Sequence, residues 1–213
     1  MQVIFLAYAL GHLGLFVASV VRLLGSRTLA SIPLILVTAG LVCDNAMIAL
    51  GSAVGAGEQL QNLSVPRYFM HAVSTPLLVL SALGLVRRSG AGWSRGSVIS
   101  AIAAVVVVAL VAFGFWSDML NLELELSTDD GLVTYSNVNS VPVAPIAVIV
   151  LIVAAGVVIW RHGGGPWLLL GALAQVAATV TGDMLAFAGN LGELALLAGF
   201  VVTDWRLRRP ARP

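Results

Sequence analysis

The sequence predicts an all-α membrane protein. It should be a bundle of seven transmembrane helices forming one domain, residues 1–213, with a short external β-hairpin between the fourth and fifth helices. Two observations carry this prediction. Of the 213 residues, 59% are hydrophobic and 10% are charged, and the mean hydropathy is +1.00, which is typical of polytopic membrane proteins. Seven segments are also apolar over about the 20 residues that a helix needs to cross a bilayer.

The expected helices lie at 2–23, 29–53, 66–86, 96–117, 143–160, 166–188 and 190–205. The first has no basic residues before it, so we expect a retained helix and not a cleaved signal peptide. Pro66 follows a polar external loop, 55–65, and should open the third helix, where its missing N–H costs little. Pro76 should kink that helix beside His71, because it frees the carbonyl of Ala72.

The distribution of charge predicts the orientation. Basic residues follow the odd-numbered helices, at Arg22, Arg27, Arg87, Arg88, Arg95, Arg161, Arg206, Arg208, Arg209 and Arg212. The other side carries Arg67 and the acids Glu58, Asp118, Glu123, Glu125, Asp129 and Asp130. Under the positive-inside rule the N-terminus is outside and the C-terminus is cytoplasmic. We expect a multi-pass protein integral to the cell membrane, the bacterial inner membrane.

Period-two alternation predicts the hairpin. Leucines alternate with polar residues from Leu120 to Leu126, which indicates a strand with one apolar face. The turn sequence 128–131 ends in Gly131, and 132–137 can return as a second strand. We expect the leucine face to rest on the mouth of the bundle, as a lid or as a cap.

Acidic residues inside the apolar segments indicate a site. Asp44 lies within the second helix, where a charged group costs about 2.5–3.5 kcal/mol on insertion scales, so it should face protein or water. At a rise of about 1.5 Å per residue, His71, Asp183 and Glu193 fall at an overlapping depth in the outer half of the bilayer. We predict a polar pocket there with apolar walls, and take Asp44, His71, Asp183 and Glu193 as its catalytic residues.

Eight further residues are predicted to bind substrate: Tyr8, His12, Asn45, Arg67, Thr75, Trp116, Gln175 and Thr179. Arg67 and Thr75 lie one turn before and after His71, and Gln175 and Thr179 precede Asp183 at the same spacing. Plainer roles stay open. Asp44 and His12 could make interhelical hydrogen bonds, Arg67 could anchor at the headgroups, and Trp116 could belong to an aromatic belt.

Several classes of function are disfavoured. The chain has no lysine, which excludes a retinal Schiff base, and no Gly-x-Ser-x-Gly elbow, which disfavours a serine hydrolase. Its three histidines lie at different depths, so we expect no metal site and no cofactor. The arginines are explained by topology, so we expect no nucleic-acid partner. No oligomeric state is predicted.

Two single residues receive structural interpretations. Cys43, the one cysteine, allows no disulfide. It points about 100° away from Asp44 around the helix and is expected in the core. Asp204 lies close to Arg206 and is expected to be a charge at the inner surface.

Clustered, buried carboxyl groups favour acid–base chemistry. Burial and mutual repulsion disfavour the charged form, so at least one of Asp44, Asp183 and Glu193 should be protonated at neutral pH. We expect an enzyme that cyclises or isomerises a lipid or isoprenoid substrate by proton transfer. Asp44 or Asp183 would donate the proton, His71 and Glu193 would orient or accept, and Arg67 would bind a polar head.

Two other functions stay open. One is a proton-coupled carrier of small molecules, because helices 1–3 and 5–7 could form parallel triplets around helix 4. The other is a membrane sensor of a ligand. The 3+1+3 layout is similar to that of the SWEET sugar carriers, although their Pro-Gln signature is absent. Seven helices with embedded acids resemble the integral-membrane terpene cyclases. Neither likeness rests on a shared motif, and no family is assigned. In each case the expected partners are a hydrophobic small molecule or lipid and the lipids of the membrane.

Overall fold

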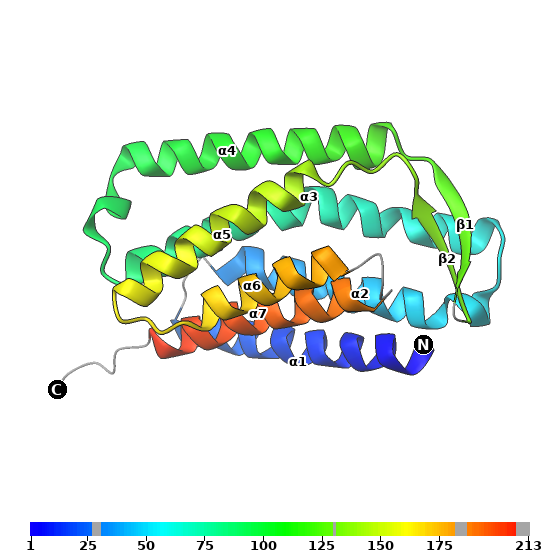
Figure 1. The fold of residues 1–213 in the computed structure, drawn as a ribbon, viewed down its shortest axis with the longest axis horizontal. Helices are drawn as coiled ribbons and strands as arrows, with labels where there is room; N and C mark the ends of the chain where they lie inside the picture. Colours follow the sequence, from blue (N-terminus) through cyan, green and yellow to red (C-terminus); the bar gives the residue numbers. More distant parts are fainter. Residues whose placement is uncertain (27–30, 130, 182–186, 208–213) are drawn as a thin grey trace.

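The computed structural model describes residues 1–26, 31–129, 131–181 and 187–207, and over these residues the predicted seven α-helices are confirmed (Figure 1). They are α1 (Gln2–Ser26), α2 (Ile32–Val54), α3 (Glu58–Arg88), α4 (Ser97–Phe115), α5 (Val143–Arg161), α6 (Trp167–Thr181) and α7 (Ala188–Arg206). A 3₁₀ turn, η2 (Gly92–Arg95), precedes α4, and a π-helical turn, η3 (Trp116–Leu120), follows it. The predicted small sheet is also present, as β1 (Leu124–Asp129) and β2 (Leu132–Asn137).

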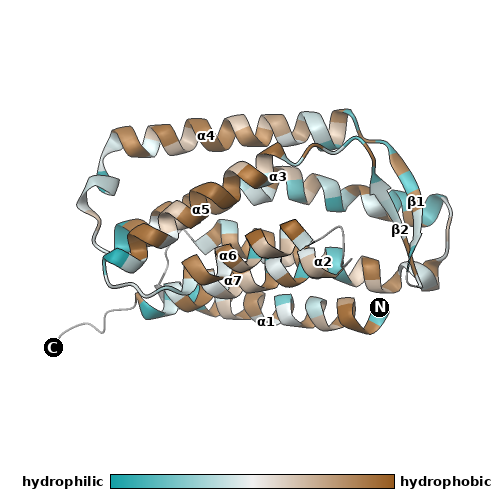
Figure 2. Ribbon diagram, viewed as in Figure 1, coloured by the Kyte–Doolittle hydropathy of each residue, from teal (hydrophilic) through white to brown (hydrophobic). Residues whose placement is uncertain are grey.

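Five of these helices are long and apolar enough to span a membrane, namely α1 to α5, and α6 is a shorter apolar helix. Figure 2 shows hydrophobic residues along most of α4 and α5. In α4 only 11% of the most apolar 18-residue window is buried, and Val98, Val105 and Val108 are each 68% exposed. Side chains of this kind on a helix surface suit contact with lipid, as in a multi-pass membrane protein.

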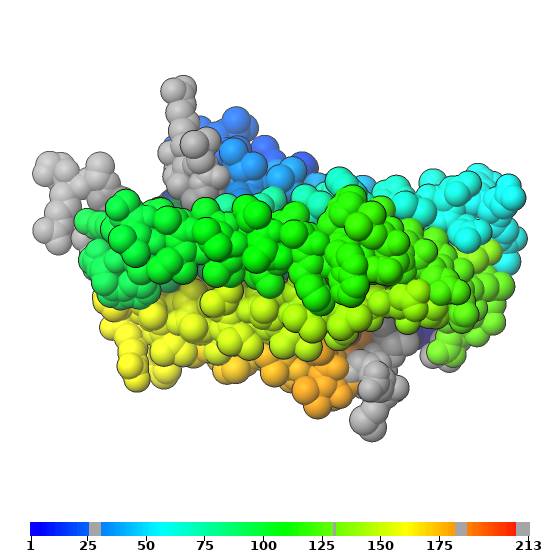
Figure 3. All heavy atoms as spheres, turned by 90° about the horizontal axis from the view of Figure 1, so that it is seen from above, coloured from blue at the N-terminus to red at the C-terminus, as the bar shows by residue number. Residues whose placement is uncertain are grey.

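Six of the helices form a closed ring. Among the described residues α1, α2, α3, α5, α6 and α7 pack each against the next, and α7 packs back on α1. Helix α4 lies outside this ring, mainly against α3, and Figure 3 shows it along one face of the molecule beside α5. Phe200, Ile152 and Leu168 are fully buried in the core. Gly171 brings α6 close to α7, since a Cβ there would lie 2.6 Å from the carbonyl oxygen of Ala195.

Helix α3 begins earlier than predicted. It starts at Glu58, so the loop expected over 55–65 is mostly helix, and Pro66 lies inside α3 instead of at its start. The reason is tertiary packing: Leu60 and Ser64 are 3% and 1% exposed, and the Ser64 hydroxyl donates to the Leu60 carbonyl at 2.8 Å. Pro76 is also within α3. Each proline leaves one carbonyl of the preceding turn without its usual helical donor.

The hairpin turns where predicted but begins later. Asp129 pairs with Leu132, so two residues connect the strands, and Gly131 has φ +77°, a conformation that favours glycine. The first strand starts at Leu124 and not at Leu120, because 116–120 form the π-helical turn.

The hairpin meets the bundle only partly through the predicted leucine face. Leu122 and Leu124 are half-buried beside Val65 of α3, whereas Leu120 and Leu126 are exposed. A further contact comes from β2, where Leu132 is buried with Phe5, Ile48 and Ala49. Gly51 of α2 permits this contact, because a Cβ there would lie 2.0 Å from the carbonyl oxygen of Val133.

Candidate functional site

Asp44 and Arg67 form a buried ion pair between α2 and α3. Asp44 is 4% exposed, and its Oδ1 accepts a hydrogen bond from the Nε of Arg67. The Arg67 guanidinium also lies 5.8 Å from the ring centre of Tyr68. The Tyr68 hydroxyl accepts from the N–H of Asn137 at 2.9 Å and donates to the carbonyl of Tyr135 at 3.0 Å. The ion pair is thus tied to the hairpin by the next residue along α3.

Asn45 links α2 to α7. Its Nδ2 donates to the Leu41 carbonyl at 2.9 Å, and its Oδ1 accepts from the Nδ2 of Asn190 at 3.1 Å. Asn45 is fully buried. Asn190 was missed as a site residue, because the sequence places it in a tight connection, whereas α7 already begins at Ala188.

His12 belongs to the same polar region, and Tyr8 supports it. The His12 ring is fully buried, and its Nδ1 donates to the carbonyl of Tyr8 at 2.9 Å. Its Nε2 is buried without a hydrogen-bond partner among the described residues, and the ring is within electrostatic range of Asp44. The Tyr8 ring is half-buried and packs edge-on against Phe5, 6.0 Å between centres.

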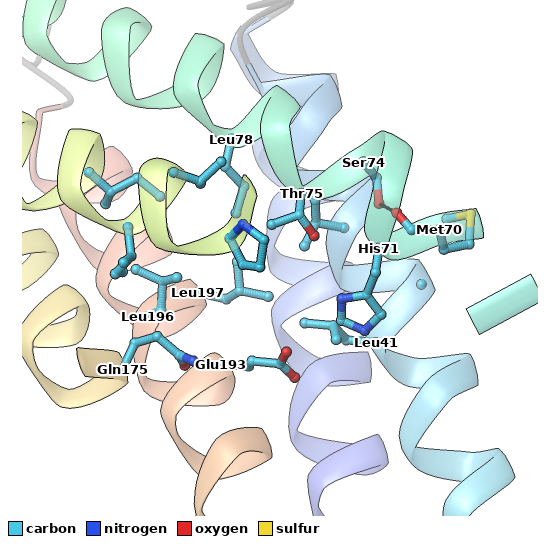
Figure 4. A pocket seen from close by; sticks show the side chains of 16 residues that line it. Leu41, Met70, His71, Ser74, Thr75, Leu78, Gln175, Glu193, Leu196 and Leu197 are labelled. Carbon is cyan, nitrogen blue, oxygen red and sulfur yellow. Dashed lines mark hydrogen bonds between the residues drawn. The ribbon is translucent and has the colours of Figure 1, made fainter. Parts of the chain in front are cut away.

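A cavity of about 90 Å³ opens beside this polar region, between α2, α3, α5, α6 and α7. Figure 4 shows the side chains that line it. Five lining residues are polar: His71, Ser74, Thr75, Gln175 and Glu193. The rest of its wall consists of Val37, Gly40, Leu41, Met70, Leu78, Pro145, Val148, Ile149, Ile152, Leu196 and Leu197. This is the mostly apolar wall with a few converging polar groups that ligand sites have.

Glu193 and His71 face each other across the cavity. Figure 4 shows them extending into the same space, from α7 and α3. The Glu193 carboxyl is within electrostatic range of His71, Asp44 and Arg67. Its Oε2 is buried and has no hydrogen-bond partner among the described residues, and the same is true of Gln175 Oε1. A buried polar atom without a partner costs roughly 1–3 kcal/mol, so two of them in one cavity mark it as a place for a ligand or water.

The remaining predicted residues lie apart from this cavity or only beside it. Thr179 is exposed, and its hydroxyl donates to the Gln175 carbonyl at 3.0 Å. Trp116 is 52% exposed and contacts Phe113, 5.7 Å between ring centres, which suits a belt residue. Cys43 is exposed on α2, so the expectation that it lies in the core is wrong. Asp183 lies outside the described residues.

Asp204 is not the surface charge that the sequence indicated. It is 5% exposed and pairs with Arg22, 2.8 Å from Nε to Oδ2, and with Arg88. These residues come from the ends of α7, α1 and α3 that lie away from the hairpin. The nearby Arg206 instead lies over the ring of Trp167, 5.0 Å from its centre. The partners of Asp204 are far away in sequence, which is why proximity along the chain misled the prediction.

Within the described ranges, no three His, Cys, Asp or Glu side chains gather as a metal ion would require. No family model matches the chain, and searches among curated proteins and among solved structures also found no match. Fold and site therefore define the class by themselves. It is a helical bundle with the apolar spans of a multi-pass membrane protein, and it has a partly polar cavity in which an acid faces an imidazole.

Proposed function

We propose that this chain is an integral-membrane enzyme that acts on a lipid or isoprenoid substrate by general acid–base chemistry in the cavity of His71 and Glu193. One observation carries the proposal. Glu193 places a buried oxygen, which has no hydrogen-bond partner among the described residues, opposite an imidazole in a mostly apolar cavity. An acid and a second titratable group on one small apolar space are the means of moving a proton to and from carbon.

The proton donor is Glu193 and not Asp44. Asp44 is already engaged with the guanidinium of Arg67, and a carboxylate held in this way serves best as a fixed charge. Glu193 has no such partner among the described residues. In a cyclisation or isomerisation, Glu193 would give its proton to a double bond, and His71 would remove a proton from the resulting cation. One proton is added and one is lost, so the product is an isomer of the substrate.

The size of the cavity sets how the substrate would bind. At about 90 Å³ it is smaller than the roughly 300–1,000 Å³ pockets that enclose whole ligands. Pro145, one of its lining residues, is exposed on α5. Only the reacting end of a lipid would therefore enter, and the remaining chain would lie along the outside of the bundle.

The proposal includes an orientation in the bacterial inner membrane. Arg22, Arg87, Arg88, Arg95, Arg161 and Arg206 all lie near the ends of elements remote from the hairpin, which carries Glu123, Glu125 and Asp129. The positive-inside rule then puts the hairpin outside the cell and the C-terminus in the cytoplasm. The substrate would reach the cavity from the outer leaflet.

The test is a comparison of lipids from cells that express the protein and its variants. Extracts are compared by mass spectrometry and chromatography for a product isomeric with a host isoprenoid or lipid. Glu193→Gln should lower product formation by about 10²–10⁴-fold, the usual contribution of a general acid. Thr181→Val is the matched control, because this residue of α6 lies outside the cavity and, in the described part of the chain, its hydroxyl bonds only to carbonyls of its own helix. Asp183→Asn is run in parallel. Full product formation by a folded Glu193→Gln protein would overturn the assignment.

A proton-coupled carrier is the second candidate, and the ring of helices favours it. Two triplets, α1–α3 and α5–α7, close the ring with α4 outside it, as in carriers built from repeats, and five of these six helices line the cavity. The ion pairs of Asp204 close the bundle at the end away from the hairpin, as a gate would. Uptake into liposomes driven by a proton gradient, with no changed lipid in expressing cells, would favour the carrier over the enzyme.

A further inference from the structure

We propose that the cavity recognises its ligand through an uncharged hydroxyl group, so that the substrate class is an apolar alcohol and not a phosphate ester or an amine. This inference rests on the proposed function, since it concerns the same cavity. It follows from which hydrogen-bonding groups of the site are already engaged and which are left over.

Among the described residues the site has no permanent cation to spare for an anionic head. Arg67 is within electrostatic range of Glu193, but its guanidinium is bonded to Asp44 and it does not line the cavity. No arginine is among the lining residues, and the chain contains no lysine. Phosphate groups are typically bound by arginine, lysine or helix N-termini. The expectation that Arg67 binds a polar head is therefore not supported by its contacts.

The hydrogen-bonding side chains of the cavity that remain available for a ligand match the donor and acceptors of a hydroxyl group. Glu193 Oε2 is buried and has no hydrogen-bond partner among the described residues. In the protonated form that the proposed chemistry requires, the carboxyl group can donate one hydrogen bond and accept another. His71 and Thr75 are half-buried and line the same cavity, so their polar atoms are within reach of a ligand there. A hydroxyl has one donor and two acceptor positions. It can donate to Glu193 and accept from the imidazole N–H or from the hydroxyl of Thr75.

The alternatives satisfy fewer of these groups. A fully ionised phosphate ester has no donor for the acceptor position of Glu193, and it brings a negative charge into a mostly apolar cavity that has no arginine or lysine among its lining residues. An ammonium group has three donors and no acceptor, so it would leave the donors of His71 and Thr75 unused. The apolar wall, which includes Leu41, Leu78 and Leu197, accommodates the carbon atoms next to the head.

The test compares three probes that share one chain: farnesol, farnesylamine and farnesyl monophosphate. Binding to the purified protein in phosphatidylcholine nanodiscs is measured by titration, without any requirement for turnover. Farnesol should bind most tightly. Glu193→Leu should weaken farnesol binding on the order of tenfold, the effect of losing one buried hydrogen bond. Glu193→Gln keeps an acceptor oxygen and should bind farnesol within a few-fold of the wild type. Thr181→Val is the control and should bind it equally well, because among the described residues the Thr181 hydroxyl bonds only to carbonyls of its own helix and the residue does not line the cavity.

The variants also separate this inference from the enzyme proposal. A Glu193→Gln protein that binds farnesol but makes no product supports both. Tighter binding of the amine or the phosphate, equal binding of all three, or no binding of farnesol by the wild type would overturn the hydroxyl assignment. These binding results do not depend on product formation. Product formation tests the acid–base proposal separately. The wild-type comparison stands even where a variant fails to fold.

Discussion

Two buried acids, Asp44 and Asp204, have similar exposure and different surroundings. Each is at most 5% exposed and pairs with arginine. Asp204 meets two arginines, from α1 and α3, and the small pocket that the described residues leave beside it is too narrow for a water molecule. Asp44 meets one arginine, and beside that pair lie a second acid, an imidazole and a cavity.

The difference separates a structural ion cluster from a site. At Asp204 two arginines from two other helices engage one carboxylate, so this cluster joins three helices. At the hairpin end Asp44 neutralises Arg67, and Glu193 keeps a buried oxygen that no described residue bonds. An ion pair buried in a bundle is therefore no sign of a site by itself. Unsatisfied groups next to open space are the better sign.

Removing Asp204 should cause the largest loss of stability. Asp204→Ala leaves Arg22 and Arg88 without this carboxylate, and breaking a buried pair by removing one partner costs about 3–5 kcal/mol. The measurement is the free energy of unfolding in detergent micelles. Asp204→Asn, which keeps the shape of the side chain, should lose less. If Asp204→Ala has the same free energy of unfolding as the wild type, Asp204 does not stabilise the bundle and the structural contrast with Asp44 is wrong.

Removing Asp44 should cost less. Asp44→Ala strips Arg67 of its ion pair, but the Arg67 side chain is 17% exposed and keeps its contact with Tyr68. We expect a loss of about 1.5–3 kcal/mol, the range for hydrogen bonds to charged groups. Asp44→Asn should fold and keep partial product formation, in contrast to Glu193→Gln. If Asp44→Asn lowers product formation more than Glu193→Gln does, Asp44 and not Glu193 is the proton donor.

The contact between the hairpin and α2 can be disrupted without a change to either acid. Gly51→Ala would place a Cβ against the Val133 carbonyl oxygen and should cost about 1–3 kcal/mol, as overpacking does. Hydrogen exchange in β2 should rise. Gly14→Ala in α1 is the control, because nothing lies within 4 Å of the added carbon. Equal exchange in both variants would show that the hairpin does not need this contact.

The cysteine substitutions needed for labelling should have the smallest effect on stability, and the labelling tests the orientation directly. In a Cys43→Ser background, Asn121→Cys at the hairpin end and Arg95→Cys at the other end are both exposed. Each should change the unfolding free energy by less than about 0.5 kcal/mol. A membrane-impermeant thiol reagent applied to intact cells should label position 121 and spare position 95. The reverse pattern would invert the proposed topology, and labelling of both from one side would refute it.

The sequence by itself determined the helices, the hairpin and the depth of the polar residues. Apolar runs of membrane-spanning length and a period-two stretch are local patterns, and the turn at Gly131 needs only the conformational freedom of one residue. Depth follows from counting residues along a helix, so Asp44, His71 and Glu193 could be placed at one level. The early start of α3 escaped this reasoning, because burial of Leu60 and Ser64 against other elements decided it.

Only the tertiary structure decided which of these residues meet. The pairing of Arg67 with Asp44, the burial of Asp204 with Arg22 and Arg88, and the place of α4 outside the ring depend on the order and rotation of the helices. These are fixed by how whole surfaces pack, at glycine contacts such as Gly171 against Ala195. A residue's neighbours along the chain say little about such contacts. Which acid is left without a partner is therefore a property of the assembled bundle.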